Sequence, residues 1–141
     1  MQEYARLIGI DVGKKRVGIA QTDLLQTIAS PVGTFSPEKV FTEIGNIVDH
    51  SPVKKFVIGW PLSLSGEEGP ATQMVEKFIR KLQNKFPDID IIKIDERYTS
   101  SRAKDMMLEA GVPQKKRREK GRVDRIAAAI ILQNYLDSNS K

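Results

Sequence analysis

Residues 4–21 read YARLIGIDVGKKRVGIAQ, and this stretch decides the fold. The apolar residues of 4–12 form a nearly continuous run, which is typical of a central strand buried on both faces. Residues 13–15 (GKK) predict a tight turn, and residues 16–21 predict a second strand that pairs with the first as a hairpin. One carboxylate, Asp11, interrupts the first apolar run.

The rest of the chain alternates apolar runs of strand length with apolar stripes at helical spacing. The expected elements, in chain order, are a strand at 28–35, a helix with Ser36 as N-cap that ends at Pro52, a strand at 55–60, a helix from Pro70, a strand at 89–94, a short helix from Thr99 or Ser100 to Gly111, and a helix at 123–136. Pro31 places its strand at a sheet edge or at a strand start. The order predicts a single α/β domain over residues 1–141, with a mixed sheet covered by helices on both faces and a frayed tail at 137–141.

Composition and charge narrow the function classes. The chain has 141 residues, the usual size of one domain with one core. Lys and Arg number 23 against 18 Asp and Glu, which leaves a net charge of +5 that suits a polyanionic substrate. The absence of cysteine excludes disulfides, thiolate metal sites and Cys-based catalysis. The one histidine, His50, is expected at a helix end, so a His-centred triad is not predicted.

The sequence also bears on location. No apolar run approaches the roughly 20 residues of a membrane span, and MQEYARLIG has no signal-peptide pattern. We therefore expect a cytoplasmic protein.

Acidic residues stand at three places next to apolar segments, where a buried carboxylate is costly unless a cation pairs with it. Asp11 lies inside the first strand, and by helical spacing Asp124 shares the apolar face of the last helix. Asp95 and Glu96 follow the strand at 89–94. Adjacent residues at a strand end point to opposite faces, so only one of the two can join Asp11, and spacing alone does not say which. The alternatives are a turn-forming role for Asp11 and helix-start roles for the others.

Three carboxylates that converge from distant parts of the chain predict a divalent-metal site. Two metal ions roughly 3.5–4 Å apart can activate water and stabilise the leaving oxygen in phosphodiester hydrolysis. Hard oxygen ligands suit Mg²⁺ or Mn²⁺, and the sequence supplies no soft ligands.

Basic residues cluster beside these acids, where they could hold substrate phosphates. The candidates for nucleic-acid binding are Lys14, Lys15, Arg16, Arg97, Lys115, Lys116, Arg117, Arg118, Lys120, Arg122 and Arg125. We expect residues 113–121 to form a mobile basic loop, and the alternative is a solvated charge run. Residues 59–72 (GWPLSLSGEEGPAT) are a weaker phosphate-binding candidate, because Glu67 and Glu68 oppose anion binding.

Four ordered segments, IGIDVGKKRVGIA, VIGWPLSLSGEEGPAT, DERYTSSRA and GRVDRIAAAIILQNYL, resemble the signatures of the YqgF family, described as pre-16S rRNA nuclease and Holliday junction resolvase-like. The resemblance spans about residues 5–136. It implies an RNase H-like fold with a five-stranded mixed sheet. It also implies that Asp11, Glu96 and Asp124 are the catalytic, metal-binding carboxylates, which resolves the choice between Asp95 and Glu96. Trp60 stands where the family pattern has Leu.

The resemblance predicts a metal-dependent endonuclease for structured nucleic acid, with Mg²⁺ or Mn²⁺ as cofactor. The implied substrates are an rRNA precursor, in 5′-end maturation of pre-16S rRNA within a pre-ribosomal particle, or a four-way DNA junction. A non-catalytic nucleic-acid-binding ribosome assembly factor is the rival class. An actin-like nucleotide-binding protein needs two domains and more residues than this chain has. The oligomeric state is left open, although a junction resolvase is expected to act as a dimer.

Overall fold

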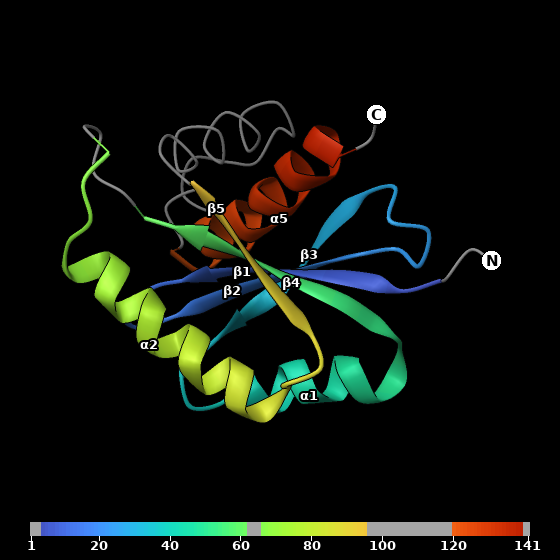
Figure 1. Cartoon of the computed structure of the whole chain (residues 1–141), viewed down its shortest axis with the longest axis horizontal. Coiled ribbons are helices and arrows are strands. Elements are labelled where there is room, and N and C mark those ends of the chain that lie inside the picture. The colour runs from blue at the N-terminus through green and yellow to red at the C-terminus, as the bar shows by residue number, and fades with distance from the viewer. Residues whose placement is uncertain (1–3, 62–65, 96–119, 140–141) are drawn as a thin grey trace.

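The computed structural model describes residues 4–61, 66–95 and 120–139, with side chains in the last segment described at 126–138. These residues form one sheet and three helices (Figure 1). In chain order the elements are β1 (Arg6–Val12), β2 (Val17–Thr22), β3 (Ala29–Phe35), α1 (Val40–His50), β4 (Val53–Trp60), α2 (Pro70–Lys85), β5 (Asp90–Asp95) and α5 (Lys120–Asn139). The short helix predicted between Thr99 or Ser100 and Gly111 lies outside the described residues. None of the helices in the described ranges is long and apolar enough to cross a membrane.

The five strands form one mixed sheet in the order β3-β2-β1-β4-β5. β1 is central, as its continuous apolar run predicted, and it pairs antiparallel with β2 and parallel with β4. β4 pairs parallel with β5. β3 lies at the edge, which confirms the prediction from Pro31. Its register shifts because Ile19 pairs with Gly33 whereas Ala20 pairs with Pro31, which leaves Val32 as a bulge.

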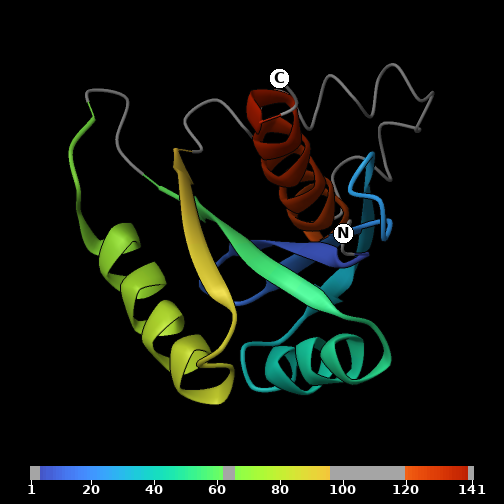
Figure 2. The same ribbon diagram turned by 45° about the vertical axis from the view of Figure 1, so that its right-hand side comes forward.

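Helices cover both faces of this sheet. α1 and α2 pack on one face and α5 packs on the other (Figure 2). Alternate residues of β1 pack into the two cores on opposite faces of the sheet. Ile8 and Ile10 belong to the core under α1 and α2, whereas Leu7 belongs to the core under α5. The predicted mixed sheet with helices on both faces is therefore confirmed.

α5 approaches β1 closely because small residues meet at the contact. A Cβ atom at Gly9 would lie 2.8 Å from the carbonyl oxygen of Ala128 and 2.8 Å from Cβ of Leu132. Only glycine avoids this overlap, so the α5 backbone rests almost directly on β1. This contact fixes the height and position of the helix above the strand.

The boundaries of several elements differ from the predictions, most of all the start of α1 and both ends of α5. α1 begins at Val40 rather than just after Ser36, because residues 37–39 form a turn that leads into the helix. Ser36 still acts as the predicted cap of this turn, since its hydroxyl accepts from Lys39 N at 3.3 Å and its carbonyl accepts from Val40 N at 3.0 Å. α5 extends beyond residues 123–136 at both ends, so residues 120 and 121 are helical and not part of a loop. Its last turn is held by a 3.0 Å bond from Gln133 Nε2 to Asp137 Oδ1, so residues 137–139 continue the helix, and residues 140 and 141 of the predicted frayed tail lie outside the described residues.

Candidate active site

The three parallel strands β1, β4 and β5 have their carboxyl ends at the same end of the sheet, and Asp11 lies at that end. Ile10 is aligned with Ile58 of β4, and Trp60 at the end of β4 is aligned with Asp95 at the end of β5. Asp11 is the next residue after Ile10, so along the parallel strands it stands one residue before the level of Trp60 and Asp95. The carboxyl ends of parallel strands are where α/β proteins place their ligand sites.

The side chain of Asp11 belongs to the α5 face of the sheet. Strand alternation groups it with Leu7, which packs under α5, and with Gly9, which touches Ala128. Asp11 is half-buried, in contrast to the fully exposed carboxylate that a surface turn would provide. The position predicted from its apolar neighbours is therefore what the fold produces.

α5 runs antiparallel to β1, and this direction brings residue 124 toward Asp11. At one end of the helix, Lys55 Nζ donates to the Tyr135 hydroxyl at 3.1 Å, and Lys55 is aligned with Leu7. Further along, Gly9 lies against Ala128. Asp124 precedes Ala128 by one helical turn, about 5.4 Å along the axis, so its backbone lies at the Asp11 end of β1. The side chain of Asp124 is outside the described part of the chain.

β5 ends at Asp95, one of the two adjacent candidate acids. Ile94 packs in the core under α5, whereas Lys93 contacts Glu76 of α2 and the ring of Trp60. By alternation Asp95 shares the α2 face with Lys93, and it is exposed there. Asp95 therefore lies on the opposite face of the sheet from Asp11. Glu96, the other candidate, lies outside the described residues.

The turn between β1 and β2 presents the first basic cluster. Gly13 N donates to the Arg16 carbonyl at 2.8 Å, and a Cβ atom at Gly13 would lie 2.6 Å from that oxygen, so the tight turn requires glycine. Lys14 and Lys15 are exposed at its tip and Arg16 is half-buried. Lys14 lines a cavity on the α2 side of the sheet, away from the face of Asp11.

The remaining basic candidates are only partly described. Arg97 and residues 115–118 lie outside the described residues, and Lys120, Arg122 and Arg125 lie in the first turns of α5, where the structure describes the backbone alone. Their predicted role in nucleic-acid binding stays a prediction. Because α5 runs toward Asp11 at this end, the positions of these three residues agree with that role.

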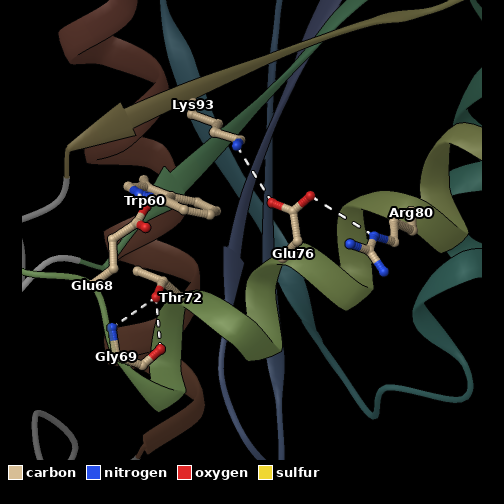
Figure 3. Close-up of polar contacts among 7 residues, drawn as sticks. All are labelled: Trp60, Glu68, Gly69, Thr72, Glu76, Arg80 and Lys93. Atoms are coloured by element: carbon tan, nitrogen blue, oxygen red, sulfur yellow. Dashed lines mark hydrogen bonds and ion pairs between the residues drawn. The ribbon is translucent and has the colours of Figure 1, made fainter.

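Trp60 anchors the loop that leaves β4 (Figure 3). Its Nε1 donates to Glu68 Oε2 at 3.2 Å, and Lys93 Nζ lies 4.1 Å from the ring centroid. Lys93 also pairs with Glu76 of α2 at 3.4 Å. The residue that departs from the family pattern thus connects β4, β5 and α2 at this edge.

The start of α2 is closed by a side chain. Gly69 N donates to Thr72 Oγ1 at 2.9 Å, and the same hydroxyl donates to the Gly69 carbonyl at 2.6 Å. The Gly69 amide is therefore engaged within the protein and is not available to a phosphate. This contact, which the sequence pattern did not reveal, weakens the case for residues 59–72 as a phosphate cradle.

The described side chains do not by themselves form a metal site. Within residues 4–61, 66–95 and 126–138, no group of three or more acidic or histidine side chains could hold a metal ion. Of the three predicted ligands only Asp11 has a described side chain, so this absence does not test the predicted set. His50 lies in the last turn of α1, with Nδ1 2.7 Å from the Asn46 carbonyl oxygen, as its predicted helix-end position requires.

Comparison with solved structures defines the class. The fold is similar to the RNase H-like fold of T. thermophilus RuvC in complex with Holliday junction substrate, with a TM-score of 0.57 over 97% of this chain and 98% of that one. The two sequences are 10% identical, so this likeness concerns the fold alone. The predicted RNase H-like fold is confirmed.

The chain belongs to the RuvX family, described as Holliday junction resolvase, whose model matches residues 5–138. Two relatives carry the name "Putative pre-16S rRNA nuclease". The one from Salinibacter ruber is 44% identical over 97% of this chain and 96% of its own length. The one from Chlorobium phaeobacteroides is 43% identical over 94% of this chain and 92% of its own length. RuvX and YqgF are names of the same family, so the family predicted from the four motifs is confirmed. The predicted nuclease class is confirmed with it.

Proposed function

We propose that this protein is a metal-dependent endonuclease for structured nucleic acid, and that Asp11, Glu96 and Asp124 are its catalytic carboxylates. The observation that carries the proposal is the antiparallel packing of α5 on β1. It sets the half-buried Asp11 at the same end of the domain as residue 124, on one face of the sheet. Asp11 lies between the buried apolar residues Ile10 and Val12, at the carboxyl end of the central strand.

The third proposed carboxylate is Glu96. Ile94 packs in the core under α5, and we propose that the strand alternation continues past the end of β5, which would bring Glu96 to the face that holds Asp11. Asp95 is assigned to the opposite face by the same argument. Glu96 is also the acid that the DER motif of the family indicates.

The proposed set fits Mg²⁺ or Mn²⁺ because all its donors are hard carboxylate oxygens and the chain has no cysteine. When bound, two such ions would supply a Lewis acid and an activated water for in-line displacement at phosphorus. The role of the protein itself would be to hold the three carboxylates in position. β1, β5 and α5 are held by two apolar cores, so the carboxylates would be fixed before substrate arrives.

The basic residues would hold the substrate backbone. Lys15 and Arg16 follow Asp11 in the β1–β2 turn, and Lys120, Arg122 and Arg125 lie in the helix start that approaches it. Phosphate contacts of this kind position a nucleic acid without reading its sequence. Arg97 and residues 115–118 are proposed to extend this surface.

We favour an rRNA precursor as substrate, with a role in 5′-end maturation of pre-16S rRNA on a pre-ribosomal particle in the cytoplasm. Its support is the name carried by relatives about equally long and more than 40% identical. A four-way DNA junction is the second candidate, and its support is the description of the matching family.

A cleavage assay with both substrates tests the proposal. The purified protein would be offered a 16S precursor RNA fragment and a synthetic four-way DNA junction, each with Mg²⁺, with Mn²⁺ and with EDTA. Metal-dependent cuts at one 5′ site of the RNA support rRNA processing, whereas symmetric cuts in the junction support the resolvase. If neither substrate is cut under any metal condition, the proposed activity is contradicted and a binding factor becomes the better account.

A further inference from the structure

A cavity lies on the face of the sheet opposite to Asp11, between the β1–β2 turn, α1 and α2. Its volume is about 340 Å³, within the range of small-ligand sites. Its apolar wall is made by both strands and both helices and consists of Val12, Val17, Pro37, Phe41, Pro70, Met74 and Phe78. The rings of Phe41 and Phe78 stack in this wall with centroids 4.9 Å apart.

The polar side of the cavity is cationic. Lys14 of the turn and Lys77 and Lys81 of α2 line it together with Gln73. Gln73, Lys77 and Lys81 follow one another at intervals of four residues, so they form one stripe along α2. Lys85 continues the stripe and lies 5.7 Å from the centroid of the Phe41 ring.

This charge is not balanced locally. No Asp or Glu of the described residues lines the cavity, and within that part of the chain the ammonium groups of Lys14, Lys77 and Lys81 make no hydrogen bond or ion pair. Glu76, the nearest acid along α2, pairs instead with Lys93 and Arg80 on another side of the helix. Like charges at i, i+4 each cost a helix about 0.2–0.5 kcal/mol, so the fold gains nothing from the stripe itself.

We propose that this cavity binds a nucleotide unit, with the base against the apolar wall and the phosphate between Lys14, Lys77 and Lys81. Gln73 offers an amide that can donate to and accept from a base edge. A flat lysine patch would suit a phosphate alone, whereas a concave apolar wall beside the lysines also accepts a ring. The unit is either a free nucleotide or one nucleotide of a strand that passes over the β1–β2 turn.

The site is separate from the proposed catalytic carboxylates, because it lies on the other face of the sheet and needs no metal. Binding is therefore measured in EDTA with the Asp11→Asn variant, so that failure of the proposed nuclease activity cannot affect the result. The probes are adenosine monophosphate, inorganic phosphate and a four-residue oligoadenylate RNA, each titrated by calorimetry.

Three variants separate the contribution of the cavity lysines to binding from that of the apolar wall. Lys77→Glu removes one cavity lysine, and Lys54→Glu, an exposed lysine at the start of β4 outside the cavity, is the control with the same charge change. Met74→Trp fills the wall and leaves every lysine in place. Circular dichroism checks that each variant is folded. Both lysines are exposed, so neither change disturbs the core.

The nucleotide site predicts that adenosine monophosphate binds more tightly than phosphate. Lys77→Glu is expected to weaken it about tenfold, a loss of about 1.4 kcal/mol, whereas Lys54→Glu stays within about twofold. Met74→Trp is expected to weaken adenosine monophosphate but not phosphate. Tighter binding of the oligonucleotide assigns the site to a strand, and equal binding assigns it to a free nucleotide. The proposal is overturned if no nucleotide probe binds, if Lys77→Glu has no more effect than Lys54→Glu, or if phosphate binds as tightly as the nucleotide.

Discussion

Gly9 of β1 lies against the backbone of Ala128 in α5, with room for no side chain between them. A Cβ atom at Gly9 would come within 2.8 Å of the Ala128 carbonyl oxygen. Both residues lie two to four positions from a proposed catalytic acid, Asp11 in the strand and Asp124 in the helix. A packing contact between two small residues thus sets the distance between two elements of the proposed site.

Gly9→Ala is predicted to destabilise the domain by about 1–3 kcal/mol, because α5 must move away from β1 to accept the methyl group. The proposed cleavage activity should fall with it. Gly45→Ala in α1 is the matched control, since its Cβ would meet only Cζ of Phe86 at 4.0 Å. That change should be neutral or stabilising by up to about 1 kcal/mol. Urea denaturation of both variants measures the difference, and equal stability would contradict the close packing.

Asp95 and Glu96 are neighbours with different predicted roles. Asp95 shares the α2 face with Lys93, so Asp95→Asn should leave cleavage within about twofold of the wild type. Glu96→Gln should lower it at least about 100-fold, since loss of even an outer-shell partner of a metal costs 10–100-fold. Single-turnover cleavage rates of the two variants show which of the two acids is needed for cleavage. Loss of activity in Asp95→Asn with retention in Glu96→Gln would reverse the assignment.

Asp23 holds the turn between β2 and β3 and carries a predicted pH dependence. Its Oδ1 accepts from Thr27 N at 2.7 Å and Ile28 N at 3.0 Å, and its Oδ2 accepts from the Thr27 hydroxyl at 2.7 Å. The amide of Ile28 and then the Thr27 hydroxyl lower the pKa of Asp23 from 3.8 to about 2. The folded-state pKa is thus below the unfolded-state value. The stabilisation is therefore present above the unfolded pKa and is lost as pH falls through the folded pKa.

Asp23→Asn removes this titration, because the amide cannot ionise and offers one acceptor where the carboxylate offers two. The variant should have a lower free energy of unfolding than the wild type at neutral pH. This difference in stability should disappear as the pH falls from about 4 to about 2. Thermal denaturation across this range measures it. A gap that stays constant down to pH 2 would mean that the turn bonds do not depend on the charge of Asp23.

Trp60→Leu restores the residue expected from the family pattern. It removes the hydrogen bond to Glu68 and the contact with Lys93, so a loss of about 1 kcal/mol in the free energy of unfolding is predicted. The proposed cleavage activity should remain, because Trp60 belongs to the core on the α2 side of the sheet. Circular dichroism in urea gives the stability, since the variant has no tryptophan to report by fluorescence. Abolished cleavage in a stable variant would give Trp60 a role that this account does not include.

Much of the fold could be predicted because its signals are local. The continuous apolar run of β1, the alternation of strands and helices, and Pro31 at the edge each depend on residues close in sequence. The start of α1 was predicted too early, since a capping serine followed by Pro37 and Glu38 suits the turn at residues 37–39 as well as a first helical turn. The ends of α5 were also misplaced, because charged and polar residues continue that helix without an apolar stripe to mark it.

The candidate site was less accessible to sequence reasoning. The apolar neighbours of Asp11 predicted that it would not be a surface residue, and it is half-buried. The separation of Asp95 from the face of Asp11 depends on which helix each residue of β5 meets. The cavity beside Lys14 brings together three lysines from the first turn and α2, and no local pattern joins such distant residues. The engagement of the Gly69 amide by Thr72 likewise depends on side-chain geometry.

The central claim is that Asp11 is a catalytic carboxylate, and one comparison of cleavage rates tests it most directly. Single-turnover cleavage of the 16S precursor RNA fragment and the DNA junction with Mg²⁺ is measured for the wild type, Asp11→Asn and Asp137→Asn. Asp137 is an exposed aspartate at the far end of α5, so it controls for the loss of one negative charge. The account predicts that Asp11→Asn lowers the rate at least about 100-fold with binding retained, while Asp137→Asn cleaves like the wild type. Equal cleavage by Asp11→Asn and the wild type would contradict it.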